Sequence, residues 1–147
     1  NNEITIIEKE LIMFCFEKDN DVRKIIKKYL NIDWLQSDLI KNIYNQIYIH
    51  LSSKDMVEPE IIMNELKDEK ARNLMAEAIF DEIEISKKII IDCLLRIEQN
   101  TLKSKLNVLR NKLKKNEHNE KQTMELIQKI NDLQKQINNL KNKYIDV

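Results

Sequence analysis

Apolar residues recur every three or four positions from about Ser86 almost to the end of the chain. This spacing predicts amphipathic helices that pack along a seam. In the first stretch the two heptad positions hold Leu95, Leu102 and Leu109, and Leu106 and Leu113. In the second they hold Leu126, Leu133 and Leu140, and Ile130, Ile137 and Tyr144. The polar segment 116–119 separates the two stretches, and Asn119 and Gln122 have the spacing of a capping box, so the chain is expected to turn there.

Two helices joined by so short a connection are predicted to pack antiparallel as a hairpin with arms of about 40 Å. Three apolar residues lie off the heptad series: Val108, Met124 and Ile127. Their positions leave apolar surface outside the seam, and we expect that surface to contact a partner.

Shorter helical patterns fill residues 1–85. Helices are expected over 4–17, in a short second segment that ends at Leu30, from Asp33 to Leu51, from Pro59 to Leu66 and from Asp68 to Phe80. Asp33 and Gln36 have capping-box spacing, Pro59 suits a first helical turn, and Asp68 and Ser86 are candidate caps. The predicted fold is all-α, with a bundle over residues 1–85 that extends into the long helix, and a hairpin over 86–147.

The composition agrees with this prediction and removes several functions. The chain has no glycine and a single proline, so the glycine-rich loops that cradle phosphates are excluded. Aromatic residues make up only 5%, which fits a helical interaction domain better than an enzyme with a deep aromatic pocket.

Charge divides the chain more sharply than hydropathy does. Residues 1–85 carry 11 Lys and Arg against 18 Asp and Glu, a balance of −7, and residues 86–147 carry 14 against 7, a balance of +7. The lysines of the basic half are spread around helices with almost no aromatic residues between them. This pattern is more typical of a solvated face than of a nucleic-acid-binding surface.

No constellation of residues predicts catalysis or metal binding. His50 and His118, the only histidines, lie far apart without ligand spacing around them, and neither cysteine has a histidine nearby. We expect His50 near a helix end, His118 in solvent, and Cys15 and Cys93 as reduced core thiols. The acidic run Asp81, Glu82 and Glu84 is expected to face water. The first residues lack the features of a signal peptide, so we expect an excised, cytoplasmic fragment that needs no cofactor.

Three stretches carry a resemblance to a known family: Ile7-Glu8-Lys9-Glu10-Leu11-Ile12, the Asn31-Ile32-Asp33-Trp34 segment leading into Ile43-Tyr44-Asn45, and the long helices from Leu94 to Leu140. Together they resemble the C-terminal helicase-binding domain of bacterial DNA primase, across essentially the whole chain. The resemblance implies a bundle that stimulates the replicative helicase and a hairpin that docks onto the helicase N-terminal domains during primer synthesis. The zinc-binding and polymerase modules of such a primase would lie upstream, so this domain itself would not be catalytic.

Because a two-helix unit leaves excess apolar area, we expect the partner-binding surface on the second arm of the hairpin, with Lys129, Lys135 and Lys141 at its rim. The predicted surface comprises Met124, Leu126, Ile127, Ile130, Leu133, Ile137, Leu140 and Tyr144. Three alternatives remain open: an N-terminal oligomerisation domain of a replicative helicase, a coiled-coil adaptor whose residues 86–147 dimerise in parallel, and a nucleic-acid-binding module that uses the basic half.

Overall fold

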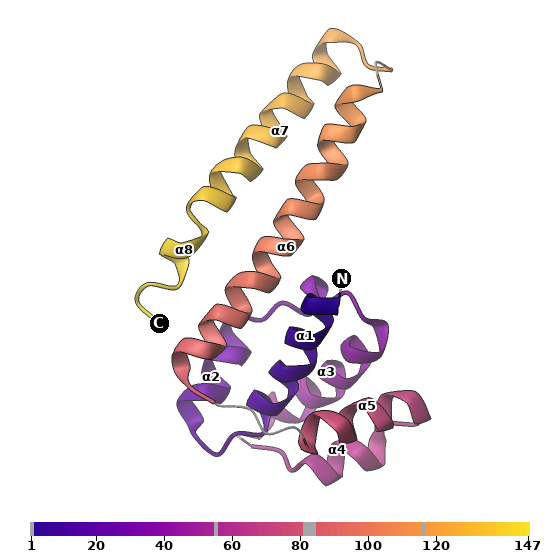
Figure 1. The fold of residues 1–147 in the computed structure, drawn as a ribbon, viewed down its shortest axis with the longest axis vertical. Helices are drawn as coiled ribbons and strands as arrows, with labels where there is room; N and C mark the ends of the chain where they lie inside the picture. The colour runs from indigo at the N-terminus through magenta and orange to yellow at the C-terminus, as the bar shows by residue number, and fades with distance from the viewer. Residues whose placement is uncertain (1, 55, 81–84, 116) are drawn as a thin grey trace. The chain divides into compact units, whose positions relative to one another are not determined.

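All regular elements in the described part of the chain are helical (Figure 1). The structure is a computed structural model that describes residues 2–54, 56–80, 85–115 and 117–147. Its helices are α1 (Asn2–Cys15), α2 (Asn20–Tyr29), the 3₁₀ turn η1 (Ile32–Trp34), α3 (Asp38–Leu51), α4 (Pro59–Glu65), α5 (Glu69–Phe80), α6 (Lys87–Lys114), α7 (Glu120–Asn138) and α8 (Leu140–Lys143). The all-α class is therefore confirmed for these residues. The acidic residues Asp81, Glu82 and Glu84 lie outside them.

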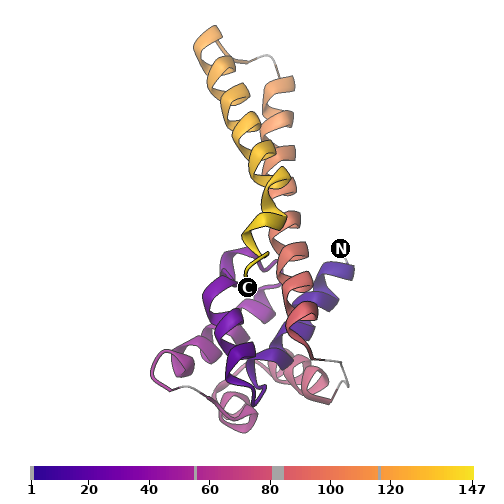
Figure 2. The same cartoon turned by 90° about the vertical axis from the view of Figure 1, so that its left-hand side faces the viewer.

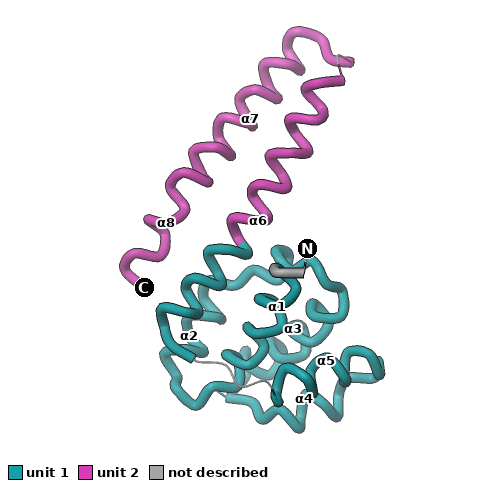
Figure 3. The backbone as a smooth tube through the Cα atoms, viewed as in Figure 1, with its two compact units in different colours: residues 1–97 teal, residues 98–147 magenta. Residues whose placement is uncertain are grey.

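Two compact units make up the chain, residues 1–97 and 98–147 (Figure 3). The division falls inside α6, further along the chain than the 85/86 boundary expected from sequence. The first turns of α6 belong to the first unit, and their apolar residues Ile90, Leu94 and Ile97 are fully buried. This agrees with a bundle that extends into the start of the long helix.

The core of the first unit lies where α1 packs against α2, α3 and α5. Leu11 and Phe14 of α1, Tyr44 and Ile47 of α3, and Met75 of α5 are all completely buried. Their spacing of three or four within each helix places them on one face, which is the face that the helical period predicts to be buried. Burial of such large side chains contributes about 1.5–3 kcal/mol each.

A buried carboxylate connects α1 to the segment that precedes α3. Glu8 is fully buried, and its Oε1 accepts a hydrogen bond from the backbone N–H of Gln36 at 2.5 Å. The hydroxyl of Tyr44 donates to the Glu8 carbonyl at 3.5 Å. Burial raises the pKa of Glu8, while the backbone donors of Gln36 and Ser37 and the charge of Lys41 oppose that rise.

The predicted start of the third helix at Asp33 is wrong. Residues 32–34 form the 3₁₀ turn η1, whose preceding Asn31 accepts a hydrogen bond from the Asp33 N–H. The helix α3 begins only at Asp38, because Ser37 is its N-cap and accepts from the Ile40 N–H at 3.3 Å. Asp33 and Ser37 are both cap candidates and lie four residues apart. Aspartate and serine side chains both form such local hydrogen bonds, so spacing alone does not show which of them starts the helix.

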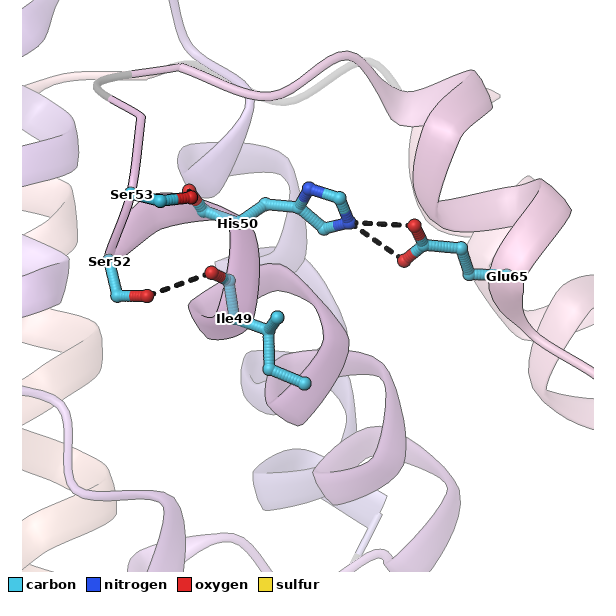
Figure 4. A network of polar contacts seen from close by, with 5 residues as sticks. All are labelled: Ile49, His50, Ser52, Ser53 and Glu65. Carbon is cyan, nitrogen blue, oxygen red and sulfur yellow. Dashed lines mark hydrogen bonds and ion pairs between the residues drawn. The ribbon is translucent and has the colours of Figure 1, made fainter.

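Two side chains fix the ends of α2 and α3. The Tyr48 hydroxyl donates to the carbonyls of Ile26 and Leu30 at the C-terminus of α2. His50, in the last turn of α3, lies with its Nε2 2.7 Å from Glu65 Oε2 at the end of α4 (Figure 4). The sequence places His50 near a helix end but does not identify this contact, which joins residues fifteen positions apart.

In the second unit, residues 98–114 of α6 and the helix α7 run in opposite directions side by side in both views (Figures 1 and 2). Arg110 Nη2 donates to Gln134 Oε1 at 3.4 Å between them. The turn is built as the sequence predicts, since Asn119 and Gln122 form a reciprocal capping box. His118 lies in this turn and contacts the Lys112 carbonyl.

The final helix ends before its heptad pattern does, since that pattern continues through Tyr144. The helix α7 ends at Asn138, and Asn139 has φ −98° and ψ 2°, outside the helical region. A single turn, α8, follows and carries Leu140 and Tyr144 into buried positions. The heptad spacing is compatible with both arrangements, because it does not register a local change of backbone direction.

Candidate partner-binding surfaces

The eight residues predicted to bind a partner fall into three groups in the structure. Leu126, Ile130, Leu133 and Ile137 are half-buried, and Leu140 and Tyr144 are buried. Met124 and Ile127 are exposed, at 63% and 39% of their surface. The structure therefore leaves Met124 and Ile127 open to a partner and places Leu140 and Tyr144 out of reach in this conformation.

Tyr144 is held inside the second unit by a charged cluster that sequence reasoning missed. Lys143 Nζ lies 2.5 Å from Glu98 Oε1, and the Tyr144 hydroxyl donates to Glu98 Oε2 at 3.1 Å. The Glu98 carboxylate is 8% exposed and Tyr144 is buried, so their hydrogen bond is shielded from water, whereas Lys143 is 41% exposed and its ion pair is partly screened. The one sequence feature that points to this cluster is Glu98 itself, a glutamate that directly follows Ile97 in an apolar stretch of the helix.

Met124 and Ile127 are three residues apart on α7 and thus share one side of the helix. The three rim lysines proposed from sequence, Lys129, Lys135 and Lys141, are all exposed. Exposed apolar side chains on a helix supply the contact area of a helix-mediated interface.

A second apolar surface lies in the first unit between α4 and α5, and the sequence did not indicate it. It is a groove of about 330 Å³ lined by Pro59, Glu60, Met63, Asn64, Ala76, Ile79 and Phe80. Phe80 is 85% exposed, and at five residues from the core residue Met75 it lies about 140° away around the helix. Its position at the last residue of α5 adds to the exposure, because a side chain at a helix end has fewer neighbouring turns to cover it.

Phe80 also borders a wider, more polar hollow on the α1 side of α5. Lys9, Asn73 and Glu77 line it, and Lys9 Nζ lies 3.3 Å from Glu77 Oε2. Apolar and charged walls therefore meet at Phe80.

The titratable groups give no support to catalysis in the described residues. Cys15 and Cys93 are free and buried, as the sequence predicts. Burial raises the pKa of Cys15 to about 12 and that of Cys93 to about 11, so both are unreactive thiols at neutral pH. No three His, Cys, Asp or Glu side chains gather as metal ligands within residues 2–54, 56–80, 85–115 and 117–147. Over the same residues, no helix has the length and apolar run needed to cross a membrane.

Comparison with known proteins adds no relative: no family model, curated protein or solved structure matches the chain. The surfaces described above are therefore the basis for any functional assignment.

Proposed function

We propose that this chain is the helicase-interaction domain of a bacterial replicative primase. In this proposal it docks the primase onto the N-terminal domains of the replicative DNA helicase in the cytoplasm and stimulates the helicase during primer synthesis. The domain is a protein-binding module and not an enzyme, and the parent protein is the nucleotidyltransferase that makes RNA primers. It is built as an N-terminal helical bundle followed by an antiparallel two-helix hairpin.

The exposed pair Met124 and Ile127 on α7 is the observation that carries this proposal. A soluble helix gains by burying such side chains, at about 25 cal/mol per Å² of apolar surface removed from water. The seam residues of the same helix, such as Leu126 and Ile130, are already half-buried against the rest of the unit. The pair is thus free to contact another protein without opening the hairpin.

The contacts across the second unit favour this proposal over a parallel coiled-coil adaptor. Arg110 meets Gln134, and Glu98 meets Lys143 and Tyr144, so α6 is paired with the later helices of its own chain. A parallel dimer would have to break these bonds and expose Leu140. Folding back therefore buries the apolar side chains at a lower cost in free energy than a parallel dimer would.

Isothermal titration calorimetry of the chain with the N-terminal domain of the source organism's replicative helicase tests the proposal. We expect the native chain to bind with measurable heat. The double variant M124D/I127D should lose at least tenfold in affinity while its helicity is unchanged. Ile137→Asp should also weaken binding, but through loosening of the hairpin, which circular dichroism will detect.

Ile49→Asp is the control, because Ile49 is an exposed isoleucine, at 61%, but lies on α3 in the first unit. It should bind like the native chain. Absence of any heat or complex with the native chain would refute the proposal. Equal losses for I49D and M124D/I127D would place the interface elsewhere.

A further inference from the structure

The second half of α6 carries an uncompensated positive charge. Between residues 101 and 115 there are six basic residues and no acidic one: Lys103, Lys105, Arg110, Lys112, Lys114 and Lys115. All six are exposed. The five lysines make no ion pair with any residue that the structure describes, and Arg110 contacts only the neutral Gln134. This surface is therefore available to an anionic partner.

The helical period sorts these charges into two rows. At 100° per residue, one row contains Lys103, Arg110 and Lys114, and the other contains Lys105 and Lys112, while Lys115 follows the last residue of the helix. The apolar seam lies on the opposite side, where Leu102 and Leu106 are buried. Sequence alone suggested lysines scattered around the helix, but burial of the seam shows that the two rows border one exposed face.

Between the two rows the helix presents a polar ridge. Ser104, Asn107 and Asn111 follow at spacings of three and four, and all three are exposed, with the exposed Val108 beside them. Asparagine can pair with the N6 and N7 edge of adenine, and serine can bond to several base edges. The face thus combines a central row of base-edge hydrogen-bonding groups with cations on both sides.

This arrangement matches the major groove of B-form DNA. That groove is about 12 Å wide and admits one α-helix, with a phosphate strand on each side. Fifteen helical residues extend about 22 Å, enough to follow the groove for part of a turn. The two basic rows would each reach one strand, and the ridge would face the bases.

Other nucleic acids fit this face less well. Single-strand binding relies on aromatic stacking, and the second unit has one aromatic residue, Tyr144, which is buried. The major groove of A-form RNA is too deep and narrow for a helix to read. We propose that the α6 face of Ser104, Asn107 and Asn111, flanked by its two basic rows, binds double-stranded DNA in the major groove.

Fluorescence anisotropy of the full chain with a labelled DNA duplex of roughly 20 base pairs, two helical turns, tests this proposal. Affinity should fall as salt rises from about 50 to 200 mM, with a slope of about −0.9 for each phosphate contact in a logarithmic plot. Each of Lys105→Ala and Lys112→Ala should reduce the steepness by about 1. No helicase is present in the assay, so its result is independent of the function proposed above.

The triple variant K105E/K112E/K115E should lose at least tenfold in affinity. Its matched control is K54E/K67E/K70E, which makes the same change in net charge at exposed lysines of the first unit. The control should stay within about threefold of the native chain, because these lysines do not belong to the α6 face that would contact the duplex. Equal losses in the two variants would mean that net charge alone attracts DNA, and would overturn the proposal.

The ridge is tested by N107A/N111A, which should lower affinity severalfold without changing the salt slope. Unchanged affinity would exclude insertion into the groove. Binding to single-stranded DNA, duplex RNA or polyglutamate as tightly as to duplex DNA would likewise overturn the proposal. Circular dichroism of every variant checks that α6 remains helical.

Discussion

The hydroxyl of Tyr144 donates a hydrogen bond to the Glu98 carboxylate at 3.1 Å, across 46 residues of sequence. Both side chains are buried, at 4% and 6% exposure. Together with Lys143, this contact fastens the last turn of the chain to α6 within the second unit. It also explains why a tyrosine at a heptad position is unavailable for docking.

Tyr144→Phe should destabilise the second unit by about 1.5–3 kcal/mol, the range for a hydrogen bond to a charged group. The buried carboxylate would lose a donor and gain nothing in return. Hydrogen exchange of α8 and of the neighbouring turns of α6 measures the effect locally. Lys143→Met should act in the same direction, whereas Lys141→Met, an exposed lysine of the same turn, should leave exchange unchanged. Similar exchange in all three variants would contradict a role for the cluster.

Glu8→Gln should change how stability depends on pH. Burial raises the pKa of Glu8 in the folded protein above its ordinary value of 4.5, so the folded state holds this proton more tightly than the unfolded chain does. The stabilisation that this gives is fully present below pH 4.5 and is lost as pH rises through the folded pKa. Glutamine keeps an oxygen that can accept from the Gln36 N–H, and its side chain has no proton to lose as pH rises.

Urea unfolding at a series of pH values from 4 to 7, near and above the ordinary glutamate pKa, checks this prediction. The native chain should lose stability more steeply than Glu8→Gln as pH rises. Glu10→Gln, on the same helix but only half-buried, is the control and should follow the native curve. A Glu8→Gln curve parallel to the native one would show that Glu8 does not titrate differently on folding.

Much of the fold follows from sequence because helix signals are local. Ser86 caps α6 by accepting from the Ile89 N–H, Asp68 caps α5 through the Lys70 N–H, and Pro59 opens α4, all as predicted. The sequence analysis misplaced the start of α3 at Asp33 and did not indicate that α7 ends before Asn139. At both places two local hydrogen-bonding patterns of similar energy compete. Long-range packing then decides between them, as Glu8 does by bonding Gln36.

The site was less predictable than the fold. The sequence shows which residues of the last helices are apolar, but their exposure depends on the neighbouring helix. Met124 and Leu140 were both assigned to the partner-binding surface from sequence, whereas in the structure Met124 is exposed and Leu140 is buried. The two basic rows of α6 were obscured for the same reason, since their common face is defined only once the buried seam is known. Glu98 was missed because its partners lie 45 and 46 residues away.

Neither cysteine should react with a thiol reagent in the folded protein. Cys15 is completely buried, and burial raises its pKa to about 12, so at pH 8 almost no reactive thiolate is present. Cys93 is only slightly more exposed and has a pKa of about 11. Labelling with a chromogenic disulfide should therefore proceed at the rate of unfolding and reach two thiols in denaturant. A fast native-state reaction of either thiol would contradict the burial described here.

Phe80 and Met75 lie on the same helix and should respond in opposite ways to truncation. Phe80 is 85% exposed and Met75 is fully buried. Met75→Ala removes core contacts and should cost about 2–5 kcal/mol, whereas Phe80→Ala should change the free energy of unfolding by less than about 0.5 kcal/mol. Urea unfolding of the two variants checks both values. A small loss for Phe80→Ala would show that Phe80 lies on the surface of the first unit and not in its core. A loss comparable to that of Met75→Ala would instead make Phe80 part of the core.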